Sequence, residues 1–204
     1  MHRTVTCLLA LVVLLSIATQ VSAQSRLLLY TSVPLELATK FVDEFTRTNK
    51  DIKVEVFRAG STDVVNKIWA ENEAGGVKAD VVWLADAASY HSFKAKGLLY
   101  PYKSPEAAKV PAELRDPDGY FTAARLINMV IGINTSLVKP DSVPRTWNDL
   151  LAMGPKAAMA NPLYSGSNFM VTAAFVNKYG GWGWLEQARK NGVQVLRGNS
   201  AVSR

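Results

Sequence analysis

Short apolar runs alternate with stretches of helical periodicity in the first half of the chain. The apolar runs have the length of strands and lie at residues 27–31, 53–59 and 79–85. After each run, apolar residues recur at helical spacing, over residues 35–48, 61–75 and 86–97. Repeated strand and helix units of this kind predict an α/β domain with a mostly parallel sheet.

Polar residues occupy the three predicted turns from strand to helix. They are Ser32, Ser61 with Thr62, and Asp86. Ligands of open α/β sheets bind just outside the carboxyl ends of the strands, so we expect these side chains to gather at one edge. Each can instead be a helix N-cap and nothing more. As a carboxylate, Asp86 would repel an anion but suit an amine or a metal ion.

The second half of the chain is less regular. Four prolines between residues 100 and 120 predict a surface excursion with one short helix. The apolar residues at 121–134 then predict a long strand that can cross between two domains. The remaining elements are expected as a helix at 147–151, a strand at 156–160, a helix after 168, a helix at 182–190 and a strand at 193–196.

Residues 161–169 form the most informative stretch, reading Asn-Pro-Leu-Tyr-Ser-Gly-Ser-Asn-Phe. The proline disfavours helix before it, while Ser165 or Ser167 can cap a helix that begins near Asn168. Gly166 lets a ligand approach the backbone at the positive end of that helix. The stretch therefore predicts a receptor for a carboxylate, phosphate or phosphonate, with an ordinary helix cap as the structural alternative.

Six stretches together carry a resemblance to a known family. They are Tyr-Thr-Ser at 30–32, Ala-Asp-Val-Val-Trp-Leu-Ala-Asp at 79–86, Gly-Leu-Leu-Tyr-Pro-Tyr at 97–102, Ile-Gly-Ile-Asn-Thr at 131–135, Pro-Arg-Thr-Trp-Asn-Asp-Leu at 144–150 and Asn-Pro-Leu-Tyr-Ser-Gly at 161–166. Their order resembles the type 2 periplasmic solute-binding proteins of ABC importers. The likeness is greatest to the ferric iron branch, which has relatives for phosphonates and sugar phosphates.

The resemblance implies two α/β lobes joined by a crossing hinge, over residues 24–128 and 129–204, with the second lobe incomplete. A solute would be captured between the lobes and presented to an ABC permease in the inner membrane by a monomer without a cofactor. Ferric iron or its chelate is the implied solute, and a phosphonate, sugar phosphate or polyamine is the alternative. The implied ligand-binding residues are Ser32, Ser61, Thr62 and Asp86 in the first lobe, Asn134 at the crossing, and Ser165, Gly166 and Ser167 in the second lobe.

Two departures from the family pattern limit the resemblance. Members of the family run well beyond the length of this chain, so we expect a C-terminal truncation that removes the return crossing. The ferric members hold iron with paired tyrosines from that part, which leaves no metal ligand in the chain present. The remaining candidates are not adjacent pairs, and we interpret them as packing or surface residues: Tyr90, Tyr100, Tyr102 and Tyr120.

Residues 1–23 have the order of a secretory signal. Arg3 precedes an apolar segment at 7–18, and Val-Ser-Ala forms a small-residue site that predicts cleavage after Ala23. The expected location is the periplasm, and an uncleaved N-terminal anchor is the alternative. Cleavage would remove Cys7, the single cysteine, so the core alone must hold the mature protein together.

Charge and motif content argue against two other function classes. The net charge is +6, but the basic residues are scattered without a basic run, which argues against nucleic-acid binding. His91 is the single histidine after residue 23, and neither Gly-x-Ser-x-Gly nor His-Glu-x-x-His occurs. An exported α/β hydrolytic enzyme therefore remains only a remote alternative, and we expect no catalytic residues. The tryptophans at 69, 83, 182 and 184 are expected in the cores of the lobes.

Overall fold

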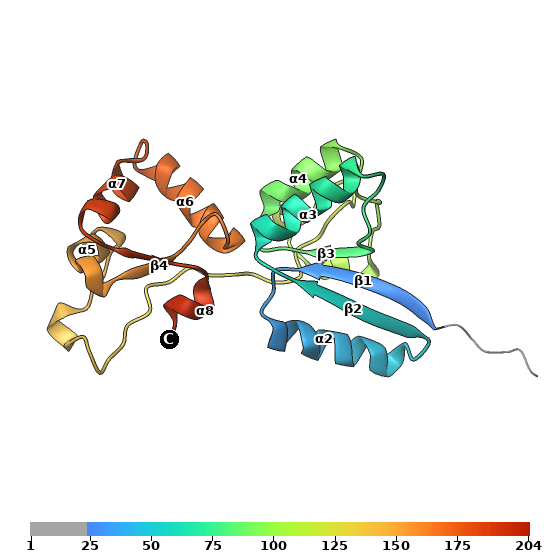
Figure 1. Cartoon of the computed structure of the whole chain (residues 1–204), viewed down its shortest axis with the longest axis horizontal. Coiled ribbons are helices and arrows are strands. Elements are labelled where there is room, and N and C mark those ends of the chain that lie inside the picture. Colours follow the sequence, from blue (N-terminus) through green and yellow to red (C-terminus); the bar gives the residue numbers. More distant parts are fainter. Residues whose placement is uncertain (1–23) are drawn as a thin grey trace, which may run out of the picture.

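Two α/β lobes joined by an extended segment make up the computed structural model, which describes residues 24–204 (Figure 1). This arrangement agrees with the predicted fold class. The predicted signal segment, including Cys7 and the cleavage after Ala23, lies outside the described residues. Among the helices that are described, none has the length and apolar character needed to cross a membrane.

The first lobe contains a parallel sheet in the order β2-β1-β3. Its strands are β1 (Ser25–Thr31), β2 (Ile52–Arg58) and β3 (Val81–Trp83). The helices are α2 (Leu35–Thr48) on one face of the sheet, and α3 (Ser61–Glu73) and α4 (Ala87–Ala95) on the other (Figure 1). All six predicted elements of this lobe are present, with β3 shorter than expected. Because the strands are parallel, their carboxyl ends share one edge of the sheet.

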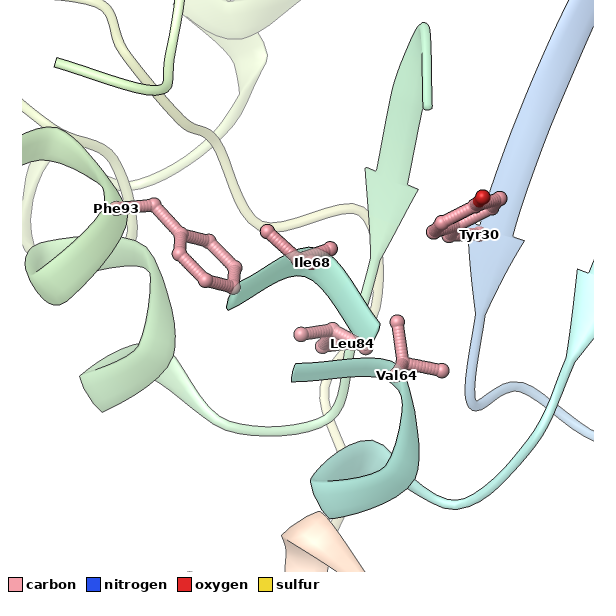
Figure 2. Close-up of a cluster of buried hydrophobic side chains, with 5 residues drawn as sticks. All are labelled: Tyr30, Val64, Ile68, Leu84 and Phe93. Atoms are coloured by element: carbon pink, nitrogen blue, oxygen red, sulfur yellow. The ribbon is translucent and has the colours of Figure 1, made fainter. Parts of the chain in front are cut away.

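The core of the first lobe lies between the sheet and helices α3 and α4. Figure 2 shows its five buried residues, Tyr30, Val64, Ile68, Leu84 and Phe93. Val64 and Ile68 are one helical turn apart, so they lie on the same face of α3. Aromatic side chains fill the space beyond them, with the rings of Phe93 and Trp69 5.3 Å apart. Since residues 24–204 contain no cysteine, the first lobe has no disulfide, and burial of apolar side chains is its main stabilising contribution.

A buried carboxylate joins α3 to the sheet. The Tyr30 hydroxyl donates to Glu71 Oε1 at 2.6 Å, and Lys67 Nζ lies 2.8 Å from the same oxygen. The backbone N–H of Lys78 donates to Oε2 at 3.0 Å. Burial alone would raise the pKa of Glu71, but the hydrogen bonds from Lys67, Tyr30 and Lys78 outweigh it and lower the pKa to about 2.

We expect Glu71→Gln to lower the free energy of unfolding by about 1–3 kcal/mol at pH 7, because it removes hydrogen bonds to a charged group. The depressed pKa means that this stabilisation is full above about pH 4.5 and is lost as pH falls toward 2. Urea unfolding at several pH values measures both effects. Glu73→Gln, at an exposed position on the same helix, is the control. Equal pH profiles for wild type and Glu71→Gln would contradict the prediction.

The segment between the lobes differs from the sequence prediction in two ways. The stretch at 100–120, where one short helix was expected, contains two 3-10 helices, Pro105–Lys109 and Ala112–Leu114, and a further 3-10 helix, Pro140–Ser142, follows later in the segment. The strand predicted at 121–134 is wrong, because residues 124–133 form no backbone hydrogen bond with the described chain. An apolar run becomes a strand only beside another strand, and no strand in residues 24–204 lies beside this one. Leu126 and Val130 are consequently 67% and 74% exposed.

The second lobe has a smaller parallel sheet of β4 (Ala158–Ala160) and β5 (Gln194–Leu196). Its helices are α5 (Trp147–Ala152), α6 (Gly166–Lys178), α7 (Gly183–Lys190) and α8 (Asn199–Val202), with a 3-10 helix at Gly154–Lys156. Phe175 and Trp184 pack at the centre of its core. The expectation that Trp182 is a core residue is wrong, since it is 61% exposed. The sequence did not predict α8.

Candidate functional site

A cleft of about 270 Å³ lies where the two lobes face each other. The first lobe contributes the loops that follow β1, β2 and β3, and the second lobe contributes the loops that follow β4 and β5. The side chains and loops that line it include Ser32, Arg58, Gly60, Ser61, Ala85, Arg125, Tyr164, Ser165, Gly166, Ser167, Arg197, Gly198, Asn199 and Arg204. The cleft therefore lies at the carboxyl ends of the strands of both sheets, as expected for an α/β fold.

Ser32 and Ser61 form a hydrogen-bonded pair on the first-lobe side. The Ser61 hydroxyl donates to Ser32 Oγ at 2.9 Å, which fixes the loop after β1 against the start of α3. Gly60 precedes α3 and offers no side-chain cap. The first backbone N–H groups of α3 therefore have no intrahelical partners, and this end of the helix faces the cleft.

Arg58 is the last residue of β2, and its side chain is held by backbone oxygens. Its Nε donates to the carbonyl of Val33 at 3.2 Å, and its Nη2 donates to the carbonyl of Ser32 at 3.4 Å. Nη1 donates to the Tyr164 hydroxyl at 3.3 Å. A guanidinium has five N–H donors, so one N–H on each terminal nitrogen remains for a ligand.

Ser165 and Ser167 form the corresponding pair on the second-lobe side. Ser165 is the N-cap of α6, where its Oγ accepts from the N–H of Asn168 at 3.4 Å. The two hydroxyls lie 3.1 Å apart, and Ser167 Oγ also accepts from Asn199 Nδ2 at 2.9 Å. One of the two hydroxyl hydrogens is used between them, so at most one is left for a ligand. The predicted cap is confirmed, with α6 beginning at Gly166.

Asn168 and Asn161 fix the start of α6 against the small sheet. The buried Asn168 side chain donates to the carbonyl of Ala160 at the end of β4. Asn161 donates its backbone N–H to the carbonyl of Leu196 at 2.6 Å, and its side chain accepts from the N–H of Leu163 at 2.9 Å. These contacts hold the loop between β4 and α6 in one conformation, which places the helix end in the cleft.

Tyr164 links the two lobes. Its hydroxyl accepts from Arg58 of the first lobe, and its ring lies 4.7 Å from the guanidinium carbon of Arg197 in the second lobe. The ring also lies against Gly60 and Gly198, where added Cβ atoms would come within 2.5 Å and 3.2 Å of it. Tyr164 therefore sets how close Arg58 and Arg197 come to each other across the cleft.

The cleft is strongly cationic. Arg58, Arg125, Arg197 and Arg204 line it, and its lining includes no Asp or Glu. None of these four guanidinium groups forms an ion pair with a carboxylate of residues 24–204. The positive ends of α3 and α6 add to this field. Cations without internal counterions, combined with free helix-end amides, provide the chemistry that holds an anion.

The structure brings together five of the eight predicted ligand-binding residues. Ser32, Ser61, Ser165, Gly166 and Ser167 line the cleft. Their contact with a ligand stays a prediction, because the described chain holds no solute.

The other three residues lie outside the cleft lining. Asp86 is 5% exposed and is the N-cap of α4, where its Oδ1 accepts from the N–H of Ser89 at 2.9 Å. Thr62 is half-buried on α3. Asn134 is exposed, and its Oδ1 accepts from the N–H of Ser136 at 3.0 Å. Asp86 Oδ1 is used as a cap, while Oδ2 lies near Gly166 of the cleft lining, so contact of Asp86 with a ligand stays a prediction.

Sequence reasoning missed the four arginines, Tyr164 and Asn199. The signal for two of them was present, because Arg58 is the last residue of β2 and Arg197 directly follows β5. Both thus lie at carboxyl ends of strands, the same position that drew attention to Ser32 and Ser61. Arg125 and Arg204 do not follow a strand, so no such signal marked them. Arg125 lies in the extended segment between the lobes, and Arg204 is the last of the described residues.

No candidate metal centre emerges from residues 24–204, which contain no group of three or more His, Cys, Asp or Glu placed to hold a metal ion. His91 is exposed on α4, and its ring contacts Phe121 with centroids 5.0 Å apart. It lies outside the cleft lining, so the pairing of Asp86 with His91 that an enzyme hypothesis needs has no geometric support.

Comparison with known proteins identifies the family. The sequence profile of the bacterial extracellular solute-binding proteins matches residues 32–200. This chain belongs to that family. The family is one of binding proteins, in agreement with the expectation of a non-catalytic function, and it implies an extracytoplasmic location. No curated protein matches the sequence significantly.

Solved structures of periplasmic binding proteins share the fold of this family member. AfuA from Actinobacillus pleuropneumoniae, solved with fructose 6-phosphate, has a TM-score of 0.72 and 23% identity over 89% of this chain and 60% of its own. Iron-bound HitA from Pseudomonas aeruginosa has a TM-score of 0.67 and 17% identity over 88% of this chain and 58% of its own. The ferric binding protein from Campylobacter jejuni has a TM-score of 0.63 and 20% identity over 87% and 57%. This solute-binding protein thus spans less than two thirds of each of those chains.

Proposed function

We propose that this chain is the solute-binding component of an ABC importer and that its solute is an organic anion carrying a phosphate or carboxylate group. The solute occupies the cleft between the lobes and is delivered to an inner-membrane permease by a periplasmic monomer. Three features support the transport role: the signal segment that the sequence predicts at residues 1–23, family membership and the two-lobed fold.

The observation that carries the choice of solute is the charge of the cleft. Four arginines and no acidic residue line it, and two helices direct their positive ends toward it. Arginine forks match phosphate and carboxylate oxygens in bidentate geometry. The volume of about 270 Å³ suits a small solute rather than a macromolecule.

The same charge argues against two of the solutes that the resemblance implied. A polyamine would bring further positive charge into a cleft whose lining within residues 24–204 has four arginines and no Asp or Glu. A bare ferric ion would likewise bring positive charge beside the four arginines of the cleft lining. A ferric chelate with carboxylates, such as ferric citrate, remains compatible with arginine and is an outcome of the experiment.

Calorimetric titration of the protein with five probes tests the proposal. The probes are inorganic phosphate, fructose 6-phosphate, citrate, ferric citrate and spermidine. We expect heat with the organic anions, an affinity that falls with added salt, and no heat with spermidine. Binding of spermidine without binding of any anion would overturn the proposal, and binding of ferric citrate with no response to citrate alone would assign the chain to iron uptake.

A further inference from the structure

We propose that Asp86 makes the cleft selective for anions that also carry a hydrogen-bond donor, either a hydroxyl or an ammonium group, a few bonds from the anionic group. Asp86 directly follows Ala85 of the cleft lining and ends the loop that joins β3 to α4. This inference rests on the proposed function, since it concerns the chemistry of the solute in the same cleft.

One oxygen of the Asp86 carboxylate has no partner in the described part of the chain. Oδ1 accepts from the N–H of Ser89 at 2.9 Å, whereas Oδ2 accepts no hydrogen bond and forms no ion pair within residues 24–204. The residue is nevertheless 5% exposed. Burying a charged group is costly unless hydrogen bonds compensate for the lost water. Oδ2 therefore favours a donor that comes from outside residues 24–204.

Oδ2 lies beside the part of the cleft that attracts an anion. A Cβ on Gly166 would lie 3.1 Å from Oδ2 and would also meet Ser61, and both Gly166 and Ser61 line the cleft. Gly166 is at the same time the first residue of α6, whose positive end lies at the junction of the lobes (Figure 1). A solute that binds this helix end through its anionic group thus brings its neighbouring substituent close to Oδ2.

The negative charge of Asp86 distinguishes it from the residues that line the cleft. The four arginines and the starts of α3 and α6 attract an anion, whereas Oδ2 repels it. An anion without a donor meets this repulsion and leaves Oδ2 unpaired. An anion with a hydroxyl or ammonium group forms a charge-assisted hydrogen bond to Oδ2 instead. Sites whose buried polar groups stay unpaired with an analogue discriminate strongly against it.

Three phosphonates that differ in one substituent test the selectivity: ethylphosphonate, 2-hydroxyethylphosphonate and 2-aminoethylphosphonate. In calorimetric titration of the wild type, we expect at least one of the two substituted compounds to bind about tenfold or more tightly than ethylphosphonate, because it gains a hydrogen bond to a charged group. The tighter of the two identifies the donor. Equal affinities for all three would overturn the role of Asp86 and leave the proposed function intact. Absence of heat with every anion would instead mean that the proposed function fails.

Asp86→Asn tests whether this carboxylate is the source of the preference. Asparagine caps a helix as well as aspartate does, so α4 is expected to remain folded. Its side-chain oxygen would replace Oδ1 as the cap and its NH₂ group would replace Oδ2, which turns the acceptor into a donor. We expect the preference to fall below about threefold. Ethylphosphonate is expected to bind more tightly than it does to wild type, because a negative charge is removed, and loss of folding cannot produce that result.

Asp63→Asn is the matched control. Asp63 is exposed in the first turn of α3 and is absent from the cleft lining, so the control makes the same change in net charge and leaves Asp86 intact. It is expected to keep the wild-type preference. Asp86→Ser is a second test, since serine also caps a helix but leaves no group in the place of Oδ2. If the preference persists in both Asp86 variants, the proposal is wrong.

Discussion

Replacing Arg58 and Arg197 together by glutamine is expected to weaken binding of fructose 6-phosphate by roughly 10²-fold or more. Each removed arginine takes away hydrogen bonds to a charged group, worth about 1.5–3 kcal/mol each. The two residues come from different lobes and meet around Tyr164, so the loss affects both sides of the cleft. Isothermal titration at fixed ionic strength measures the change in affinity.

The control for the arginine pair is Arg47→Gln with Arg189→Gln. These two arginines lie one on each lobe, are exposed, and are absent from the cleft lining. The control changes the net charge by the same amount, so a long-range effect of charge would appear in both double variants. Equal losses of affinity in the two would contradict a local role for Arg58 and Arg197.

Phe93→Ala is expected to lower the free energy of unfolding by about 3–5 kcal/mol, the range for removal of a buried aromatic ring. Phe93 is 1% exposed and packs against Trp69 and Tyr90 in the core of the first lobe (Figure 2). Few other atoms can fill the space that the ring leaves, because the surrounding residues belong to the sheet and two helices. Chemical denaturation followed by circular dichroism measures the change.

Tyr100→Ala is the matched aromatic control, since Tyr100 is 85% exposed. It is expected to change the free energy of unfolding by less than about 0.5 kcal/mol. A loss for Phe93→Ala no larger than that of the control would mean that the cluster between α3, α4 and the sheet is not the main source of stability in that lobe.

The sequence predicted the elements whose patterns are strong and local. Helix α2 and strands β1 and β2 were placed within two residues of their observed bounds, because apolar periodicity and turn residues agree there. The run at 121–134 was misjudged because its composition indicates a strand, whereas a strand also needs a neighbour to accept its hydrogen bonds. Strand propensity depends on the residues of the segment, whereas strand pairing depends on whether the fold places another strand beside it.

The candidate site was likewise predicted only where the local sequence pattern is recognisable. Ser32, Ser61 and Ser165 were found because turns that precede helices have a recognisable composition. Arg58 and Arg197 were overlooked because basic residues separated by 139 positions look scattered in the sequence, and only the packing of the lobes brings them to one tyrosine. Asp86 was found in the same way, and one of its carboxylate oxygens caps α4.

The extended segment at 124–133 affects how strong the contact between the lobes at Tyr164 has to be. In the described part of the chain it is the one connection between the lobes, and it has no backbone hydrogen bonds to restrain it. A short flexible tether keeps two linked surfaces at an effective concentration on the order of millimolar. A contact too weak to hold separate molecules together is thus sufficient here. The contacts of Tyr164 with Gly60 and Arg58 need to fix only the geometry of the approach, because the tether keeps the two lobes close together.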